Sequence, residues 1–134
     1  MATIFTSIIK RELPAFIVAE DENYIAFLDI SPLVEGHVLV VPKEEVDYIY
    51  NLSDDTLIGL HLFAKKVARA IRATIECKRI GMTVIGLEVP HAHIHLIPIQ
   101  KMDDMNFANM KLSPSNKELA ATAASIGAAF QDSI

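Results

Sequence analysis

The sequence predicts an α+β domain, with a five-stranded, mainly antiparallel sheet, one main helix packed on it and a C-terminal helix. Three observations lead to this prediction. Short runs of β-branched and aromatic residues recur near the start, one long stretch has apolar residues at helical spacing, and an alanine-rich stretch lies near the end. Because few helices separate the strands, antiparallel pairing is favoured.

The strands are predicted from apolar runs that turn-forming residues separate. Asp21 to Asn23 divides the first two runs, which indicates a hairpin, and Pro42 stops the third run. The five strands are predicted at residues 16–20, 24–30, 37–41, 79–86 and 90–98.

Two helices follow from apolar spacing and capping signals. The main helix is predicted over residues 53–76, after a serine that can serve as its N-cap. The last helix is predicted over residues 113–130. Ser115 and Glu118 have capping-box spacing, while the Ser-Pro pair at residues 113–114 offers a competing start one turn earlier.

Length and composition indicate one domain, with residues 1–100 as its main part and residues 101–134 as a loop-plus-helix extension. The net charge of −5 has the wrong sign for holding nucleic acid through its phosphates. The single cysteine, Cys77, excludes an internal disulfide. No apolar run approaches the roughly 18 residues of a membrane span, and residues 1–10 lack the pattern of a signal peptide. We therefore expect a cytoplasmic protein that binds neither nucleic acid nor membrane.

Three histidines at alternating positions, His91, His93 and His95, are the most informative feature of the chain. In a strand, successive side chains point to opposite faces, so the three imidazoles share one face and the apolar residues between them enter the core. Neighbouring histidines would then lie roughly 7 Å apart along the strand. The pattern gathers three of the five histidines on one patch.

The spacing alone leaves three interpretations open. One imidazole can attack phosphorus as a nucleophile while the others donate hydrogen bonds to the phosphoryl oxygens. The same histidines can chelate a metal ion, although three imidazoles along a strand reach one tetrahedral ion poorly. They can also be the polar face of an edge strand without any chemistry.

Two segments resemble the histidine triad superfamily. The run from Pro90 to Pro98 is similar to its His-x-His-x-His-x-x signature, and residues 25–43 are similar to its other recurrent stretch. Residues 4–9 also resemble the family, so that the likeness covers about the first 100 residues. The resemblance is to the Hint-like branch, and it implies a two-fold homodimer in which two sheets join into one.

The resemblance implies a nucleotide hydrolase or transferase that acts on the α-phosphate of a purine nucleoside phosphoramidate or a similar conjugate. His93 would form a covalent nucleotidyl-histidine, which water would discharge to a nucleoside monophosphate. His95 and His37 would contact the phosphate oxygens, and the His91 carbonyl would orient the ring of His93. No cofactor or metal is needed for this step. Two alternatives are a nucleotide-binding scaffold of low activity and a metal-dependent hydrolase with histidine ligands.

The resemblance also implies a nucleoside site. Asp29 matches the acidic residue that binds the ribose hydroxyls, a task that suits a carboxylate. Phe5, Ile8, Phe27 and Ile30 match the apolar slot for the base, and aromatic and branched walls suit a planar ring.

Two departures from the family pattern bear on function. Thr3 and Thr6 stand where many relatives carry cysteines for a structural zinc, so we expect no such zinc here. Residues 86–90 lack the polar groups that relatives use to contact phosphates and leaving group, and they add Glu88, which could repel a polyphosphate. For residues 101–134 we expect packing at the dimer interface or beside the partner's pocket.

Overall fold

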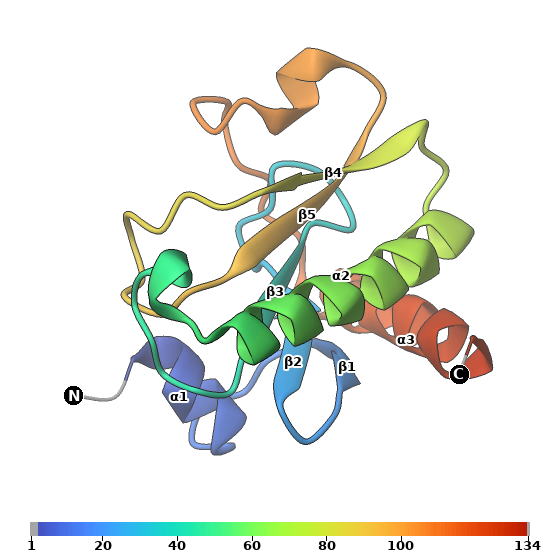
Figure 1. The fold of residues 1–134 in the computed structure, drawn as a ribbon. Coiled ribbons are helices and arrows are strands. Elements are labelled where there is room, and N and C mark those ends of the chain that lie inside the picture. The colour runs from blue at the N-terminus through green and yellow to red at the C-terminus, as the bar shows by residue number, and fades with distance from the viewer. Residues whose placement is uncertain (1–2, 134) are drawn as a thin grey trace.

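The computed structural model describes residues 3–133, so the outer ends of the predicted main part and extension, residues 1–2 and 134, lie outside the described residues. Five strands form one antiparallel sheet in the order β1-β2-β3-β5-β4 (Figure 1). The predicted α+β class and antiparallel sheet are confirmed. The strands are β1 (Ile17–Glu20), β2 (Tyr24–Leu28), β3 (Val38–Pro42), β4 (Arg79–Thr83) and β5 (Ile94–Ile99).

Both predicted helices are present, and a short helix that the sequence did not predict precedes them. That helix has only six residues and begins after Thr3, whose hydroxyl accepts a hydrogen bond from the Thr6 amide. Within the described residues, no helix is both long enough and apolar enough to cross a membrane. The helices are α1 (Ile4–Ile9), α2 (Asp54–Thr74) and α3 (Asn116–Asp132), with the 3₁₀ turns η1 (Ile49–Asn51) and η2 (Met102–Met105).

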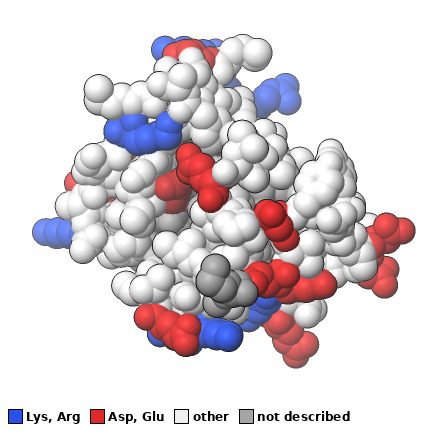
Figure 2. All heavy atoms as spheres, turned by 90° about the vertical axis from the view of Figure 1, so that its left-hand side faces the viewer, with Lys and Arg blue, Asp and Glu red and all other residues white. Residues whose placement is uncertain are grey.

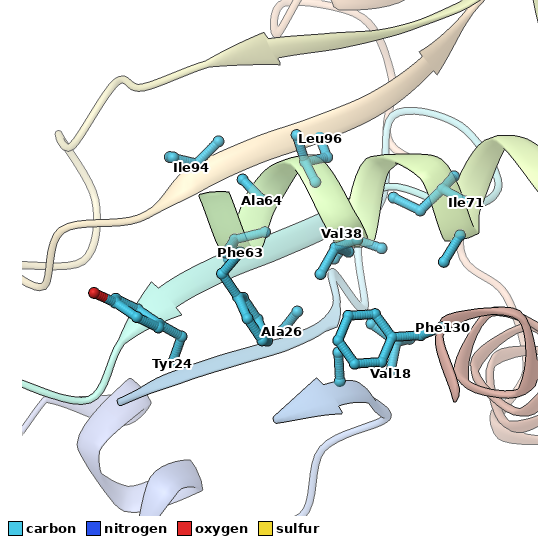
Figure 3. Close-up of a cluster of buried hydrophobic side chains, with 14 of the residues drawn as sticks. Val18, Tyr24, Ala26, Val38, Phe63, Ala64, Ile71, Ile94, Leu96 and Phe130 are labelled. Carbon is cyan, nitrogen blue, oxygen red and sulfur yellow. The ribbon is translucent and has the colours of Figure 1, made fainter. Parts of the chain in front are cut away.

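The main core fills the space between the sheet and the two long helices (Figure 3). Phe63 of α2 and Phe130 of α3 meet there with ring centroids 5.8 Å apart. Gly59 lets Tyr24 lie against α2, because a Cβ at that position would come within 2.0 Å of the tyrosine hydroxyl. Leu119 and Ile126 of α3 are buried in the same core. The C-terminal helix therefore packs within its own chain.

A smaller core lies on the opposite face of the sheet, under α1. Phe5 and Ile8 of α1 pack there on Phe27 and Leu39. Side chains alternate along β3 and β5, so the residues that flank the core positions Val38, Val40, Ile94 and Leu96 turn toward this second face. His37 and His95 are among them, and the sheet thus presents both rings on the α1 side.

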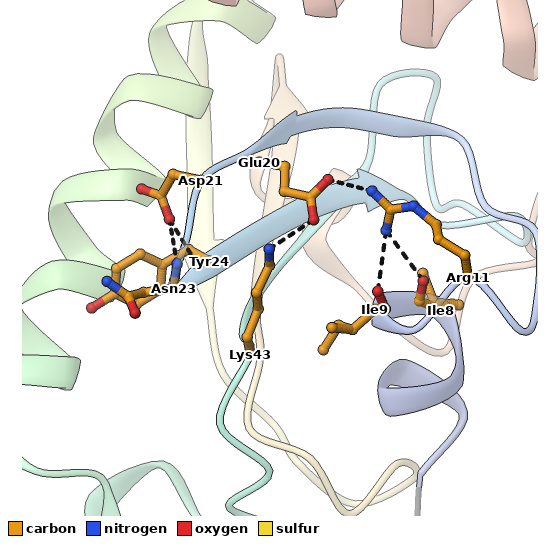
Figure 4. Close-up of polar contacts among 8 residues, drawn as sticks. All are labelled: Ile8, Ile9, Arg11, Glu20, Asp21, Asn23, Tyr24 and Lys43. Carbon is orange, nitrogen blue, oxygen red and sulfur yellow. Dashed lines mark hydrogen bonds and ion pairs between the residues drawn. The ribbon is translucent and has the colours of Figure 1, made fainter.

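An ion pair and hydrogen bonds of Arg11 tie the end of α1 to the sheet (Figure 4). The Arg11 guanidinium pairs with Glu20 of β1 and also donates to the Ile8 and Ile9 carbonyls at the end of α1. Lys43 binds the other oxygen of Glu20 at 2.8 Å. These bonds hold the helix that carries Phe5 in a fixed position over the second face.

The histidine strand begins later than predicted. Residues 90–98 were expected to be extended throughout, but β5 starts at Ile94, so His91 and His93 precede it. Pairing with β3 ends at Val40 and Ile94, and the amide of Ala92 donates to Val46 at 2.7 Å instead. The backbone leaves the sheet at this point.

The bounds of three other elements differ from the predicted ranges by a few residues. The last helix starts at Asn116 with Ser115 and Glu118 forming the capping box, so the competing start one turn earlier is wrong. Strand β2 ends at Leu28, which leaves Asp29 just beyond it, and β4 stops at Thr83.

Candidate active site

His37 and His95 form a hydrogen-bonded chain whose proton positions are set from one end. The Leu33 amide donates to His37 Nδ1 at 3.1 Å, so the proton of a neutral His37 must sit on Nε2. His37 Nε2 lies 3.0 Å from His95 Nδ1 and donates to it. His95 then carries its own proton on Nε2. The chain therefore ends in an N–H donor of the kind that binds a phosphoryl oxygen.

His93 is held as the other neutral tautomer, with its proton on Nδ1 and a lone pair on Nε2. Its Nδ1–H donates to the His91 carbonyl at 2.7 Å, and a carbonyl can only accept. Its ring lies edge-on to Phe5, with centroids 5.0 Å apart, and 4.9 Å from the ring of His95. The two histidine rings lie closer than the strand repeat predicts, because His93 precedes β5. Among the three aligned imidazoles, His93 thus offers a lone pair beside a hydrogen-bond donor.

Burial keeps these rings neutral. Desolvation, followed by the neighbouring charges, lowers the pKa of His37 to about 3 and that of His95 to about 4. Burial also lowers the pKa of His93 below its ordinary 6.5, although the hydrogen bond to the His91 carbonyl opposes the shift. At neutral pH all three are uncharged, which agrees with the tautomers above.

The side chain of His91 faces away from the other two rings. Its Nε2–H donates to the Pro42 carbonyl at 2.8 Å, and its Nδ1 accepts from the Thr3 hydroxyl at 3.0 Å. The Thr3 amide and the Thr6 hydroxyl both donate to Glu45. Only the carbonyl of His91 contacts His93, so the sequence-predicted His91 is attached to the site through its backbone.

The same hydrogen bonds bear on a structural zinc. Zinc in proteins is held by thiolate, imidazole or carboxylate groups, and Thr3 and Thr6 offer neutral hydroxyls in the places of the cysteines. The Nδ1 lone pair of His91 is occupied by Thr3. The residues present therefore do not fit this metal.

Asp29 lies at the end of β2, beside the histidines. Its Oδ1 accepts from the Ser31 amide at 2.9 Å, and its Oδ2 lies 3.9 Å from His37 Nε2. Since His37 is neutral, this contact is not an ion pair. Burial raises the pKa of Asp29, the Ser31 hydrogen bond lowers it, and the nearby charge of Glu88 raises it again. The second oxygen remains available to a hydroxyl ligand.

A metal bound between Asp29, His37 and His95 is disfavoured by the tautomers. Ligand atoms of the three residues lie within 4.8 Å of one another. Coordination through His37 Nε2 would move its proton to Nδ1, where it would face the Leu33 N–H. Two donors would then oppose each other, so these residues fit a hydrogen-bond relay and do not fit a metal site.

The predicted base slot is only partly open. Phe5, Ile8 and Phe27 belong to the second core and are buried, with Phe5 and Phe27 edge-to-face at 5.4 Å. Ile30 is 64% exposed. Of the four predicted residues, Ile30 is therefore the one whose surface is free for a ligand.

A cavity of about 640 Å³ adjoins His93 on its other side. Apolar and aromatic side chains form much of its wall, among them Tyr48, Tyr50 and Ile85. His61 of α2 lies at the same cavity, with its Nδ1 2.9 Å from the Leu57 carbonyl, and it forms no hydrogen bond with the other four histidines of residues 3–133. The cavity gives space beside the His93 side chain.

The sequence did not reveal two residues from the loop after β5. The Phe107 ring lies 5.0 Å from that of His95 and 6.1 Å from that of His37. Lys111 lies 5.9 Å above the Phe107 ring. The only signal was an aromatic residue in a polar stretch, which does not reveal a fold-back onto a distant strand.

Comparisons with known proteins agree with this geometry. Residues 10–102 match the family model of the HIT domain. The chain is 38% identical over 98 residues to the adenosine 5′-monophosphoramidase HNT1 of Saccharomyces cerevisiae, covering 72% of this chain and 62% of that protein. It is 38% identical over 102 residues to the protein hit of Bacillus subtilis, covering 71% of this chain and 69% of that protein.

Solved structures show the same fold. A zinc-bound histidine triad family protein from Mycobacterium smegmatis superposes with a TM-score of 0.85 at 25% identity, over 98% of this chain and 95% of that one. A Hit-like protein from Bartonella henselae gives 0.82 at 29% identity, over 95% of both chains. The family model covers most of the chain, and the resemblance inferred from the two motifs is confirmed: this protein belongs to the HIT domain family.

Proposed function

We propose that this protein is a cytoplasmic nucleotide hydrolase or transferase that acts on the α-phosphate of a purine nucleoside phosphoramidate or a similar conjugate. The observation that carries the proposal is the fixed tautomer of His93, whose Nδ1–H bonds to the His91 carbonyl and leaves Nε2 as a lone pair. The similarity to the yeast adenosine 5′-monophosphoramidase supports the substrate class.

The reaction has two steps, of which the first takes up one proton and the second releases one. His93 Nε2 bonds to phosphorus, the P–N bond to the amine breaks, and the amine leaves with that electron pair and takes up a proton. The ring becomes cationic, and the His91 carbonyl at Nδ1 stabilises that charge. Water then attacks phosphorus, the P–Nε2 bond breaks, and the nucleoside monophosphate and a proton are released.

The remaining site residues have assigned tasks in this proposal. His95, through Nε2–H, donates to a phosphoryl oxygen, and His37 sets the tautomer of His95. Asp29 binds the ribose hydroxyls with its free oxygen. The base lies against Ile30, with the packed Phe5, Ile8 and Phe27 as the apolar layer beneath. The cavity beside His93 takes the leaving group.

Turnover and its pH dependence test this proposal. Incubation with an adenosine phosphoramidate is expected to release AMP, with or without a chelator. Because burial lowers the pKa of His93 below its ordinary 6.5, the acid limb of kcat/KM, where the nucleophile becomes protonated, should be centred below pH 6.5. An acid limb centred above pH 6.5 would contradict the assignment.

The same assay separates the two rivals. AMP binding without turnover of any nucleotide conjugate would support the scaffold of low activity. Loss of turnover with a chelator, restored by zinc, would support the metal-dependent hydrolase.

We also propose a homodimer in which two β4 strands meet and join the sheets. Within the described residues β4 pairs only with β5, so its outer edge has free backbone groups. Met82 and Val84 are exposed along this edge, and Ile58 and Leu62 are exposed on the neighbouring helix α2. A second copy would cover this apolar surface and satisfy both edges.

Light scattering coupled to gel filtration tests the dimer. We expect the mass of two 14.8 kDa chains for the wild type and of one chain for Met82→Lys, since a buried unpaired ammonium is costly. Met102→Lys, at a 93% exposed position outside this surface, is the matched control and should remain dimeric. A monomeric wild type at micromolar concentration would rule the dimer out.

A further inference from the structure

The loop between β5 and α3 folds back over the histidines. The Phe107 ring is edge-on to His95, with an interplanar angle of 75°, and edge-on to His37, with an angle of 81°. The Leu112 amide donates to the Pro32 carbonyl at 2.8 Å, which fastens the loop to the segment that follows Asp29. Residues 106–112 therefore form one wall of the site in their own chain.

Lys111 is held at this wall with its charge exposed. Its ammonium group donates to the carbonyls of Phe107 and Asn109, and it lies 5.9 Å from the centroid of the Phe107 ring. An ammonium group has three donors, so one N–H remains for another partner. The side chain is exposed, and its charge lowers the pKa of both Asp29 and His37, so its field reaches these residues.

The charges around the histidines make this lysine significant. Asp29 and Glu88 are both acidic and lie close enough for the charge of Glu88 to raise the pKa of Asp29 and of His93. Acidic side chains gather over the lower right of the face in Figure 2, while basic ones lie scattered around it. Of the lysines and arginines in residues 3–133, only Lys111 shifts the pKa of Asp29 or His37. An anionic substrate meets two carboxylates and one cation.

We propose that Lys111 binds the phosphate of the nucleotide, and that Phe107 and the loop fastened to Pro32 hold it in position. This inference rests on the proposed function and assigns the phosphate contact that residues 86–90 do not supply. The remaining N–H of the ammonium group donates to a phosphate oxygen, and the cation offsets the repulsion from Asp29 and Glu88. The C-terminal extension is then part of the nucleotide site.

Binding of AMP and of adenosine to the full chain, measured by titration calorimetry, tests this role. Lys111→Gln should weaken AMP binding about tenfold, the loss of one charge-assisted hydrogen bond, and leave adenosine binding unchanged. Lys111→Arg keeps the charge and should bind AMP nearly as the wild type does. Lys117→Gln, an exposed lysine on α3, is the matched control and should change neither ligand.

Each other outcome has a distinct meaning. Equal weakening of AMP and adenosine in Lys111→Gln would make the residue a structural support of the loop and overturn the phosphate contact. Wild-type affinity for AMP in that variant, in a protein that turns over substrate, would overturn this inference alone. If the wild type bound no AMP and released none, the proposed function would fall with it.

Discussion

Replacement of His93 by alanine is expected to lower kcat by about 10⁴-fold, because in the proposed mechanism the variant loses the nucleophile of the covalent step. No neighbour can take its place. The Nδ1 of His95 accepts from His37 and its Nε2 carries the proton, while both nitrogens of His91 are bonded to Thr3 and Pro42. Steady-state assays with an adenosine phosphoramidate measure the loss.

Two controls accompany the His93 variant. Its ring packs on Phe5, so the fold of His93→Ala must be checked by thermal unfolding and by AMP binding, which should persist. Lys117→Ala, at an exposed position of α3, should keep wild-type kcat. A folded His93→Ala protein with more than a tenth of the activity, or a nucleotidyl adduct on His95 in mass spectrometry, would refute the assignment.

Acidification from pH 6.5 to 4 is expected to destabilise the protein steeply. Folded His37 and His95 have pKa values of about 3 and about 4, whereas in the unfolded chain both titrate near 6.5. In this window the unfolded chain binds protons that the folded protein does not, so the stabilisation is complete above pH 6.5 and is lost as the pH falls. Two such groups lower the free energy of unfolding by about 2–3 kcal/mol per pH unit.

Urea unfolding at several pH values measures this dependence. His37→Gln removes one of the two groups, and its slope should be shallower by about 1.4 kcal/mol per pH unit. The side chains and charges that face His37 (His95, His93, Lys111 and Asp29) remain in this variant. Lys117→Gln, which changes an exposed side chain of α3 that does not titrate in this window, should retain the full slope. Equal stability of the wild type at pH 5 and pH 7 would show that the buried rings accept protons without cost.

The sequence predicted the sheet because its signals are local. Alternation of apolar residues identifies the strands, and the same alternation sends Ile94 and Leu96 into the main core while His95 faces the other side. The two family motifs predicted which histidines to examine. A six-residue helix such as α1 has too few turns to show helical spacing, and its cap, Thr3, is stabilised by contacts with residues 45 and 91.

The parts of the site that escaped prediction depend on long-range placement. The late start of β5 follows from the bond between the Ala92 amide and the Val46 carbonyl, which no local pattern contains. Phe107 reaches the histidines, and Lys111 lies above the Phe107 ring, because Leu112 is fastened to Pro32, far away in the sequence. The tautomers depend on the Leu33 amide, and a backbone donor has no signature in side-chain identity.

The hydrogen bond from the Leu33 amide to His37 limits which residues position 33 can accept. A main-chain N–H, and not a side chain, determines which nitrogen of His37 is unprotonated. The identity of the side chain at position 33 therefore has almost no effect on where the proton lies. Every amino acid except proline has the backbone N–H that donates this hydrogen bond. Position 33 is thus constrained by packing and by the need for a backbone N–H, and proline there would remove the contact that fixes the proton order along both rings.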